Sequence, residues 1–234
     1  MGHRAQLTAV AVACVLALVG CVPQDGDATG EEGDRTTTAI DPSRPDDGSS
    51  RTRAAPSSTT IPDDFPLAAG MAAPEDEIAT SRTGTGLRDL ELCGAAPLRG
   101  LGLRDRMVAD NSGGEAIDTR ELVLLGSPEE AAELAQSFSD LAADCDDRGP
   151  AQDFETLTEV RGSSFGSSPA VTLLQTYELE GEPVPGTMVI HVVPAGAALL
   201  VASTYGEWAP GDLDEGIAGT AEAVRRTVAA LDDF

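Results

Sequence analysis

The sequence predicts a single α+β domain, in which a mainly antiparallel sheet of about six or seven strands carries two principal helices. Two observations favour this class. Apolar and β-branched runs of strand length dominate residues 87–204, whereas only two segments repeat apolar residues at helical spacing. Few of the connections are long helical crossovers, so neighbouring strands are expected to run antiparallel.

The first three strands are expected at Leu87–Cys93, Leu103–Ala109 and Ala116–Leu125. Asn111-Ser-Gly-Gly114 separates the second from the third and is typical of a hairpin turn. A turn centred on Ser112-Gly113 would create two cross-strand pairs of opposite charge, which favours this register. The expected pairs are Asp105 with Arg120 and Arg104 with Glu121.

The first helix is expected to begin after Ser127, which is a good N-cap. Pro128 then occupies the first helical position and Glu130 completes a capping box. Gly149-Pro150 would end the helix. Its apolar stripe consists of Ala131, Leu134, Ala135, Phe138, Leu141, Ala142 and Cys145, so that Cys145 would lie on the buried face.

Four further strands and a second helix complete the expected order. The strands are Phe154–Arg161, Val171–Glu180, Thr187–Val193 and Ala197–Thr204. Asp212 would cap the last helix with Glu215 closing its box, and the apolar stripe is Ile217, Ala221, Val224, Val228 and Leu231. The uncharged stretch from Pro183 to Gly206 is long enough for a membrane span, but Pro194-Ala-Gly196 at its centre favours a buried hairpin.

The first 21 residues predict where the protein is located in the cell. A short basic start is followed by an uncharged apolar run, Ala5–Gly20, which is typical of a signal peptide. Leu18-Val-Gly-Cys21 matches the bacterial lipobox, so we expect cleavage before Cys21 and acylation of its thiol. The alternative is an ordinary signal peptide with a chance cysteine. The expected location is the outer face of the cell membrane, with a lipid anchor as the membrane contact.

Cysteine parity agrees with export. Cys14 would leave with the signal peptide and Cys21 would be acylated, which leaves Cys93 and Cys145 as one pair in an oxidising compartment. We therefore expect a Cys93–Cys145 disulfide. A metal site is the competing interpretation, but the sequence has no Cys-x-x-Cys spacing and only two histidines. No metal and no cofactor are expected.

Charge excludes one class of partner. The chain has 15 basic residues, all arginine, against 40 acids, a net charge of −25. Residues 63–234 hold 32 of the acids and 10 of the arginines, a net −22, and such a surface repels nucleic acid and anionic lipid headgroups. Residues 21–62, rich in Asp, Gly, Ser, Thr and Pro, are expected to form a disordered tether that holds the domain at 63–234 away from the membrane.

From about Phe65 onward the chain resembles the actinobacterial sensor-like extracellular domains, the PknH-like family typified by the extracellular domain of a mycobacterial serine/threonine kinase. The resemblance rests on four features: Cys93-Gly94, the strand Glu121–Leu125, the helix from Ser127 to Cys145, and the ending from Met188 to Leu231. It implies a central antiparallel sheet and a cleft for an unidentified envelope ligand. That kinase domain has two disulfides, whereas this chain has cysteines for one.

Few residues suggest chemistry. Gly162-Ser-Ser-Phe-Gly166 matches a nucleophile elbow around Ser164, but a strand is expected to follow it, and the single remaining histidine, His191, lies in mid-strand. Tyr205 and Trp208 lie between the last strand and the last helix, where they could contact a glycan or lipid headgroup. Packing of Trp208 under the helix start is the ordinary alternative.

Three classes of function therefore remain. The first is a non-catalytic binding or sensor-like domain for an envelope ligand, a glycan, lipid or protein, presented on a lipid-anchored tether. The second is a lipoprotein that assists another envelope component through protein contacts. The third is a serine hydrolase that uses Ser164. A cleft would favour the first, a flat exposed apolar patch the second, and a converging Ser164–His191–acid set the third.

Overall fold

The computed structural model describes residues 59–71, 78–111, 117–145, 154–166 and 168–234. They belong to one compact unit, Arg53–Phe234. The predicted signal peptide, Cys21 and nearly all of the predicted tether lie outside the described residues. Within the described ranges, no helix combines the length and the apolar character that crossing a bilayer requires.

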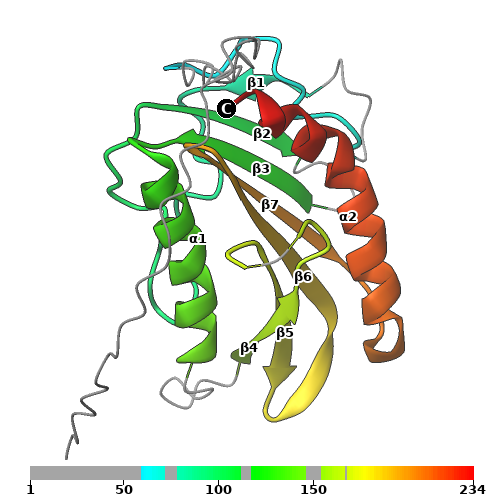
Figure 1. The fold of residues 1–234 in the computed structure, drawn as a ribbon. Coiled ribbons are helices and arrows are strands. Elements are labelled where there is room, and N and C mark those ends of the chain that lie inside the picture. Colours follow the sequence, from blue (N-terminus) through cyan, green and yellow to red (C-terminus); the bar gives the residue numbers. More distant parts are fainter. Residues whose placement is uncertain (1–58, 72–77, 112–116, 146–153, 167) are drawn as a thin grey trace, which may run out of the picture. The chain divides into compact units, whose positions relative to one another are not determined.

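Seven strands form one sheet in which every neighbouring pair is antiparallel, in the order β1-β2-β3-β7-β6-β5-β4 (Figure 1). The predicted α+β class and its antiparallel sheet are confirmed. The uncharged stretch from Pro183 forms a hairpin between two central strands. The strands are β1 (Thr80–Ser81), β2 (Asp105–Asn111), β3 (Ile117–Leu124), β4 (Phe154–Gly162), β5 (Val171–Leu179), β6 (Glu182–Ala195) and β7 (Ala198–Gly206).

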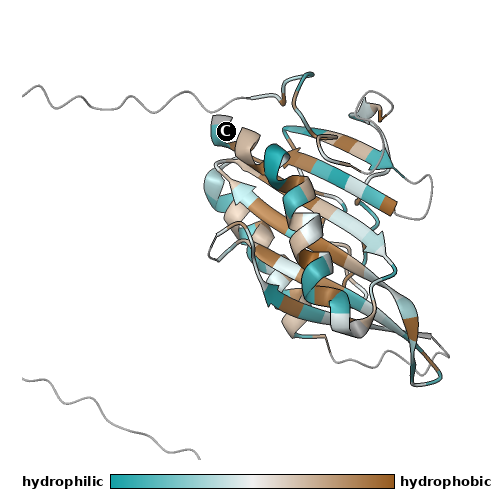
Figure 2. Ribbon diagram, turned by 90° about the vertical axis from the view of Figure 1, so that its right-hand side faces the viewer, coloured by the Kyte–Doolittle hydropathy of each residue, from teal (hydrophilic) through white to brown (hydrophobic). Residues whose placement is uncertain are grey.

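The two principal helices cover opposite faces of this sheet (Figures 1 and 2). Helix α1 (Pro128–Ala143) packs with Val123 and the other side chains of its face, and helix α2 (Leu213–Ala229) packs with Leu122 and Leu124. Strand alternation explains the division, because successive side chains of β3 point to opposite faces. Short 3-10 helices precede and follow α2 at Pro210–Asp212 and Ala230–Asp233.

The start of α1 agrees with the prediction and its end does not. The Ser127 hydroxyl accepts a hydrogen bond from the Glu130 amide at 3.2 Å, and the Glu130 carboxylate accepts from the Gly126 amide at 2.8 Å. The helix stops at Ala143, so Cys145 lies beyond it and not on its apolar stripe. Cys145 instead forms the predicted disulfide with Cys93, with the two Cα atoms 5.5 Å apart. The bond ties the end of α1 to the loop before β2.

The cap of α2 differs from the prediction. Asp212 is the N-cap, but its side chain makes no capping hydrogen bond. The 3-10 turn at Pro210–Asp212 precedes the helix instead, and the Asp212 amide donates to the Ala209 carbonyl at 2.8 Å. The apolar stripe is correct in outline, since Ala221, Val224 and Leu231 are buried.

The register of the β2–β3 hairpin was predicted wrongly. Asp105 pairs with Leu124, and Arg120 pairs with Ala109, so the pairing is shifted by four residues relative to a turn at Ser112-Gly113. Glu121 instead forms an ion pair with Arg106, at 2.8 Å, on the face of the sheet that α1 covers. Cross-strand charge matching failed here because buried ion pairs and the hydrophobic faces decide the register.

The strand predicted at Leu87–Cys93 is absent, because this segment forms turns with a single isolated bridge between Leu92 and Ala95. Its leucines are nevertheless buried on the α1 side: Leu87, Leu92 and Leu98 pack with Phe138. Burial alone therefore produced the strand-like pattern. The first strand of the sheet is instead the short β1, Thr80–Ser81, which pairs with β2.

The segment at residues 59–71 packs on the α2 side of the sheet. Ile61, placed in the predicted tether, is buried, and its amide donates to the Asp105 carboxylate at 2.8 Å. Arg82 forms ion pairs with Asp105 and Asp63. Phe65 and Leu67 join the core beside α2. This packing places the backbone carbonyls of Leu67 and Ala69 next to β3, where they accept hydrogen bonds from Arg120.

Candidate ligand pocket beneath helix α2

A pocket of about 340 Å³ opens between the first half of α2 and the sheet. The sheet contributes its floor, α2 one wall and the loop after β7 another. We call this the α2 pocket. Its volume lies at the small end of the range typical of ligand sites. The lining residues are Gly70, Asp118, Thr204, Trp208, Glu215, Gly216, Gly219, Thr220 and Ala223.

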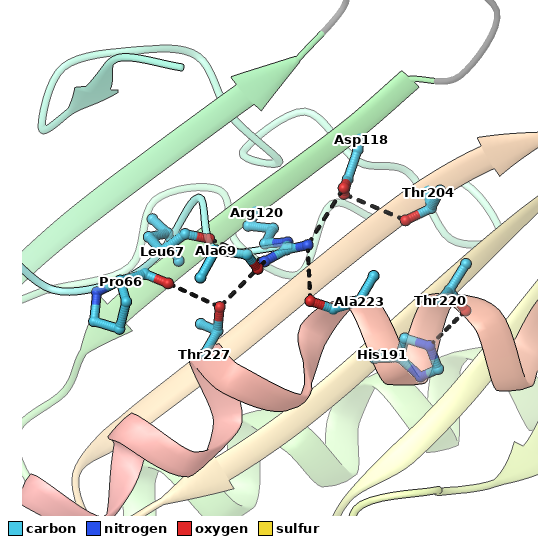
Figure 3. A network of polar contacts seen from close by, with 10 residues as sticks. All are labelled: Pro66, Leu67, Ala69, Asp118, Arg120, His191, Thr204, Thr220, Ala223 and Thr227. Atoms are coloured by element: carbon cyan, nitrogen blue, oxygen red, sulfur yellow. Dashed lines mark hydrogen bonds and ion pairs between the residues drawn. The ribbon is translucent and has the colours of Figure 1, made fainter. Parts of the chain in front are cut away.

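A fully buried arginine lies next to Asp118, on the same face of β3 as the floor of the α2 pocket. Arg120 is 0% exposed, and its guanidinium donates to the carbonyls of Ala69 (2.6 Å) and Leu67 (3.2 Å) and to the Thr227 hydroxyl (3.1 Å). Its other terminal nitrogen lies 3.4 Å from both Asp118 and the Ala223 carbonyl (Figure 3). A buried guanidinium requires such a set of acceptors. Arg120 therefore connects the segment at residues 59–71 and the sheet with α2.

Asp118 is the acidic group of the floor. It is 4% exposed, and its carboxylate accepts from the Thr204 hydroxyl at 3.3 Å as well as facing Arg120 at 3.4 Å. Burial raises the pKa of Asp118 above its ordinary value, although Arg120 and Thr204 oppose the shift. Both contacts are long for hydrogen bonds to a carboxylate, so this buried acid retains room to accept a stronger donor.

His191 on β6 lies beside the pocket and is held on both sides. Its Nδ1 lies 3.0 Å from the Thr172 hydroxyl and its Nε2 lies 2.9 Å from the Thr220 hydroxyl (Figure 3 shows the latter). Thr220 donates its single hydroxyl proton to the Ile217 carbonyl at 3.0 Å. Nε2 must therefore carry the ring proton and Nδ1 must accept. Burial, assisted by the charge of Arg120, lowers the pKa of His191 to about 4, so the ring is neutral at physiological pH.

Trp208 forms the aromatic wall of the α2 pocket, and it is half-buried. Its indole packs against two glycines: a Cβ added to Gly216 would lie 2.7 Å from Cδ2, and one added to Gly206 would lie 2.9 Å from Cη2. Trp208 therefore covers the start of α2 and lines a pocket at the same time. From the sequence alone these two roles were alternatives.

Tyr205, which was predicted beside Trp208, does not line the α2 pocket. It pairs with Ile117 and Met188 across β7, and its ring centroid lies 6.4 Å from that of Tyr177. Strand alternation turns Tyr205 to the face opposite Thr204, which faces the pocket. The structure thus separates the two aromatic residues that the sequence places three positions apart.

The residues of the proposed hydrolase do not form a triad here. Ser164 is exposed, and both ring nitrogens of His191 contact threonine hydroxyls. His191 instead meets the neighbouring Phe165 edge to face, with centroids 5.3 Å apart. Among the described residues, no group of three or more His, Cys, Asp or Glu side chains is placed to hold a metal ion.

The fold and the pocket together define an α+β domain with one helix on each face of a seven-stranded antiparallel sheet and a small pocket under the second helix. No family model and no curated protein matches the sequence. Among solved structures, the extracellular domain of PknH from Mycobacterium tuberculosis is similar, with 14% identity and a TM-score of 0.37 over 55% of this chain and 61% of that domain. The chain thus matches about three fifths of that domain.

Proposed function

We propose that this chain is an exported lipoprotein, tethered to the outer face of the cell membrane through Cys21, whose folded domain binds a cell-envelope ligand without catalysing a reaction. The α2 pocket is the observation that carries the binding role. It combines an indole wall, Trp208, with a buried carboxylate, Asp118, and such a mixture of apolar surface and a few placed polar groups is typical of ligand sites.

The chemistry of the pocket favours binding over acid–base catalysis. The one imidazole nearby is neutral and has both nitrogens engaged by threonines. Arg120 is fully buried, and backbone carbonyls occupy its guanidinium. These groups hold the pocket in shape, whereas a general base must reach its substrate.

The proposed extracytoplasmic localisation rests on the sequence pattern at Ala5–Cys21 and on the disulfide. A bond between Cys93 and Cys145 is typical of proteins in oxidising compartments. An acyl chain on Cys21 together with a polar linker would hold the α2 pocket at the membrane surface, where envelope components are concentrated.

The proposed lipid anchor is tested by measuring acylation of Cys21. Cells producing the wild-type protein or a Cys21→Ala variant are fed a clickable fatty-acid analogue, and the labelled protein is compared. We expect labelling of the wild type alone. The variant Cys14→Ala, which changes a cysteine within the expected signal peptide, serves as the control and should label normally. Equal labelling of the Cys21→Ala variant contradicts the lipoprotein assignment.

Binding is tested with the emission of Trp208, the only tryptophan of the chain. Aqueous and organic extracts of the cell envelope are titrated into the intact protein, and into a Gly219→Leu variant. Gly219 lines the α2 pocket, and a Cβ at this position meets no atom within 4 Å, so a leucine is added to the wall of the pocket without a clash at its Cβ. We expect a saturable change in emission that the variant abolishes. A response of equal size in both proteins contradicts binding in this pocket.

A second candidate function is supported by the opposite face of the sheet. Ile117 and Leu179 are each 46% exposed, and they lie beside the Tyr177–Tyr205 pair. Exposed apolar side chains grouped in this way mark protein-interaction surfaces. If an envelope protein binds there, Ile117→Asp should abolish its in-cell cross-linking to this chain, whereas Gly219→Leu should leave it intact.

A further inference from the structure

From its lining we infer that the α2 pocket takes a small organic ammonium group, either a quaternary ammonium or an alkylamine. This inference rests on the proposed binding function and names the chemical class of its ligand. Two acidic residues and a tryptophan line the same cavity: Asp118 from β3, Glu215 from the first turn of α2, and Trp208 from the loop between β7 and α2. A cation lying over an indole is attracted by the ring electrons, and carboxylates complete its coordination.

The charges around the cavity favour a cation. Asp118 and Glu215 line it, and Asp212 and Asp214 add exposed acids at the start of α2. Arg120, the cation that contacts Asp118, also donates to the carbonyls of Leu67 and Ala69 and to the Thr227 hydroxyl. The described charges at this end of α2 are thus mainly acidic, and the net charge of −25 steers cations toward the chain.

The shape of the cavity favours an organic cation. Of the three glycines in the lining, Gly219 leaves open space where a side chain would begin, so a bulky group can approach the backbone there, whereas Gly70 and Gly216 lie against Ala223 and Trp208. A volume of about 340 Å³ accommodates on the order of ten non-hydrogen atoms, the size of a head group. A hard metal ion requires six or more oxygen ligands, whereas much of this wall is indole and glycine. Methyl or methylene groups next to the positive nitrogen match that surface.

A neutral sugar fits the lining less well. Sugar hydroxyls are usually held by side chains that both donate and accept, and the lining contains no amide side chain. Its two threonine hydroxyls already donate: Thr204 to Asp118, and Thr220 to Ile217. The accessible polar atoms are therefore chiefly acceptors, and an ammonium group supplies the donors or the positive charge that they lack.

The test compares choline with its neutral carbon analogue 3,3-dimethylbutan-1-ol, using Trp208 emission of the intact protein. Choline and putrescine should each give a saturable change that weakens with added salt, and the neutral analogue should give none. Free choline and vesicles of phosphatidylcholine are compared in separate arms, which distinguish a soluble ligand from a lipid head group. A response in either arm supports the inference.

Two matched variants test the role of charge. Glu215→Gln removes the carboxylate from the pocket wall, and Asp214→Asn removes a neighbouring one that does not line the cavity. Both residues are exposed, so both variants should fold. We expect Glu215→Gln to raise the choline Kd on the order of tenfold, the loss of one charge-assisted contact, and Asp214→Asn to change it by less than about twofold.

The possible outcomes distinguish failure of the ammonium inference from failure of the proposed binding function. An equal response to the neutral analogue, or unchanged choline affinity in Glu215→Gln, overturns the ammonium inference. So does an envelope extract that binds in a Gly219-dependent way while every ammonium probe fails, and in that case the proposed function stands. If neither the probes nor the extracts change the emission, both proposals are wrong.

Discussion

Trp208 rests on α2 where Gly216 has no side chain, and a Cβ at that position would lie 2.7 Å from the indole. Three residues along the same helix, a Cβ on Gly219 would meet nothing within 4 Å. The two glycines thus differ in their surroundings although both lie within α2. Gly216 lies directly under the Trp208 indole, whereas Gly219 lines the α2 pocket with open space where a side chain would begin.

This difference predicts opposite effects of the same substitution. Gly219→Ala should raise the free energy of unfolding by about 0.5–1 kcal/mol, since alanine favours a helix over glycine. Gly216→Ala should lower it and should red-shift the emission of a displaced Trp208. Urea unfolding of both variants checks the pair. A gain of stability in Gly216→Ala would contradict the packing of the indole on α2.

The buried guanidinium of Arg120 is expected to matter far more than exposed arginines. Arg120→Ala removes the positive charge beside the buried Asp118 and the donor to several carbonyls, and it should lower the free energy of unfolding by about 3–5 kcal/mol. Arg225→Ala, the control, breaks an exposed pair with Glu222 and should cost about 0–0.5 kcal/mol. Comparable losses in the two variants would show that Arg120 does not hold the segments together.

The disulfide between Cys93 and Cys145 closes a loop with a sequence separation of 52. By the chain-entropy model it should contribute about 4 kcal/mol to the free energy of unfolding. The double variant Cys93→Ser/Cys145→Ser should lose that amount in urea unfolding. Adding a reductant to the wild type should reproduce the loss, and it should leave the variant unchanged.

His191 should make the stability depend on pH. Its pKa falls from 6.5 to about 4 on folding. Between these two pH values the histidine is protonated in the unfolded chain and neutral in the folded protein. The stability is therefore complete above pH 6.5 and declines as the pH falls toward 4, by about 2 kcal/mol between pH 7 and pH 5.

Urea unfolding of the wild type and of His191→Gln at the two pH values isolates this effect. The raised pKa of Asp118 acts in the opposite direction, but it contributes to both proteins and cancels in the difference. The variant should lose the His191-dependent part of the decline. An identical pH dependence in the two proteins would mean that His191 is not buried in its neutral form.

Much of the fold could be predicted because its strands from Asp105 onward are apolar runs between clear turns. The turns at Leu87–Cys93 escaped prediction since their leucines are buried without pairing in the sheet. The hairpin register escaped because Glu121 pairs with Arg106, a neighbour that cross-strand matching did not consider. The end of α1 was placed too late because Cys145 continued the apolar stripe in sequence but not in structure.

The pocket was only partly foreseen. Trp208 was predicted from the scarcity of aromatic residues, whereas the floor depends on contacts between distant segments, such as that of Arg120 with Thr227 at a separation of 107 residues. One local signal existed: Asp118 and Arg120 share a strand face with the buried Leu122. Charges on an inward face are a sign of a buried polar site.

Amide NMR of the ¹⁵N-labelled protein during titration with envelope extract tests the central claim most directly. The account predicts that the indole N–H of Trp208 and the amides of Gly216 and Gly219 shift together and saturate at one ligand concentration. It also predicts that Ile117 and Tyr205, on the other face of the sheet, keep their positions. Shifts that gather around Ile117 and Tyr205 and leave the α2 pocket unchanged would contradict the account and place the binding surface on the opposite face.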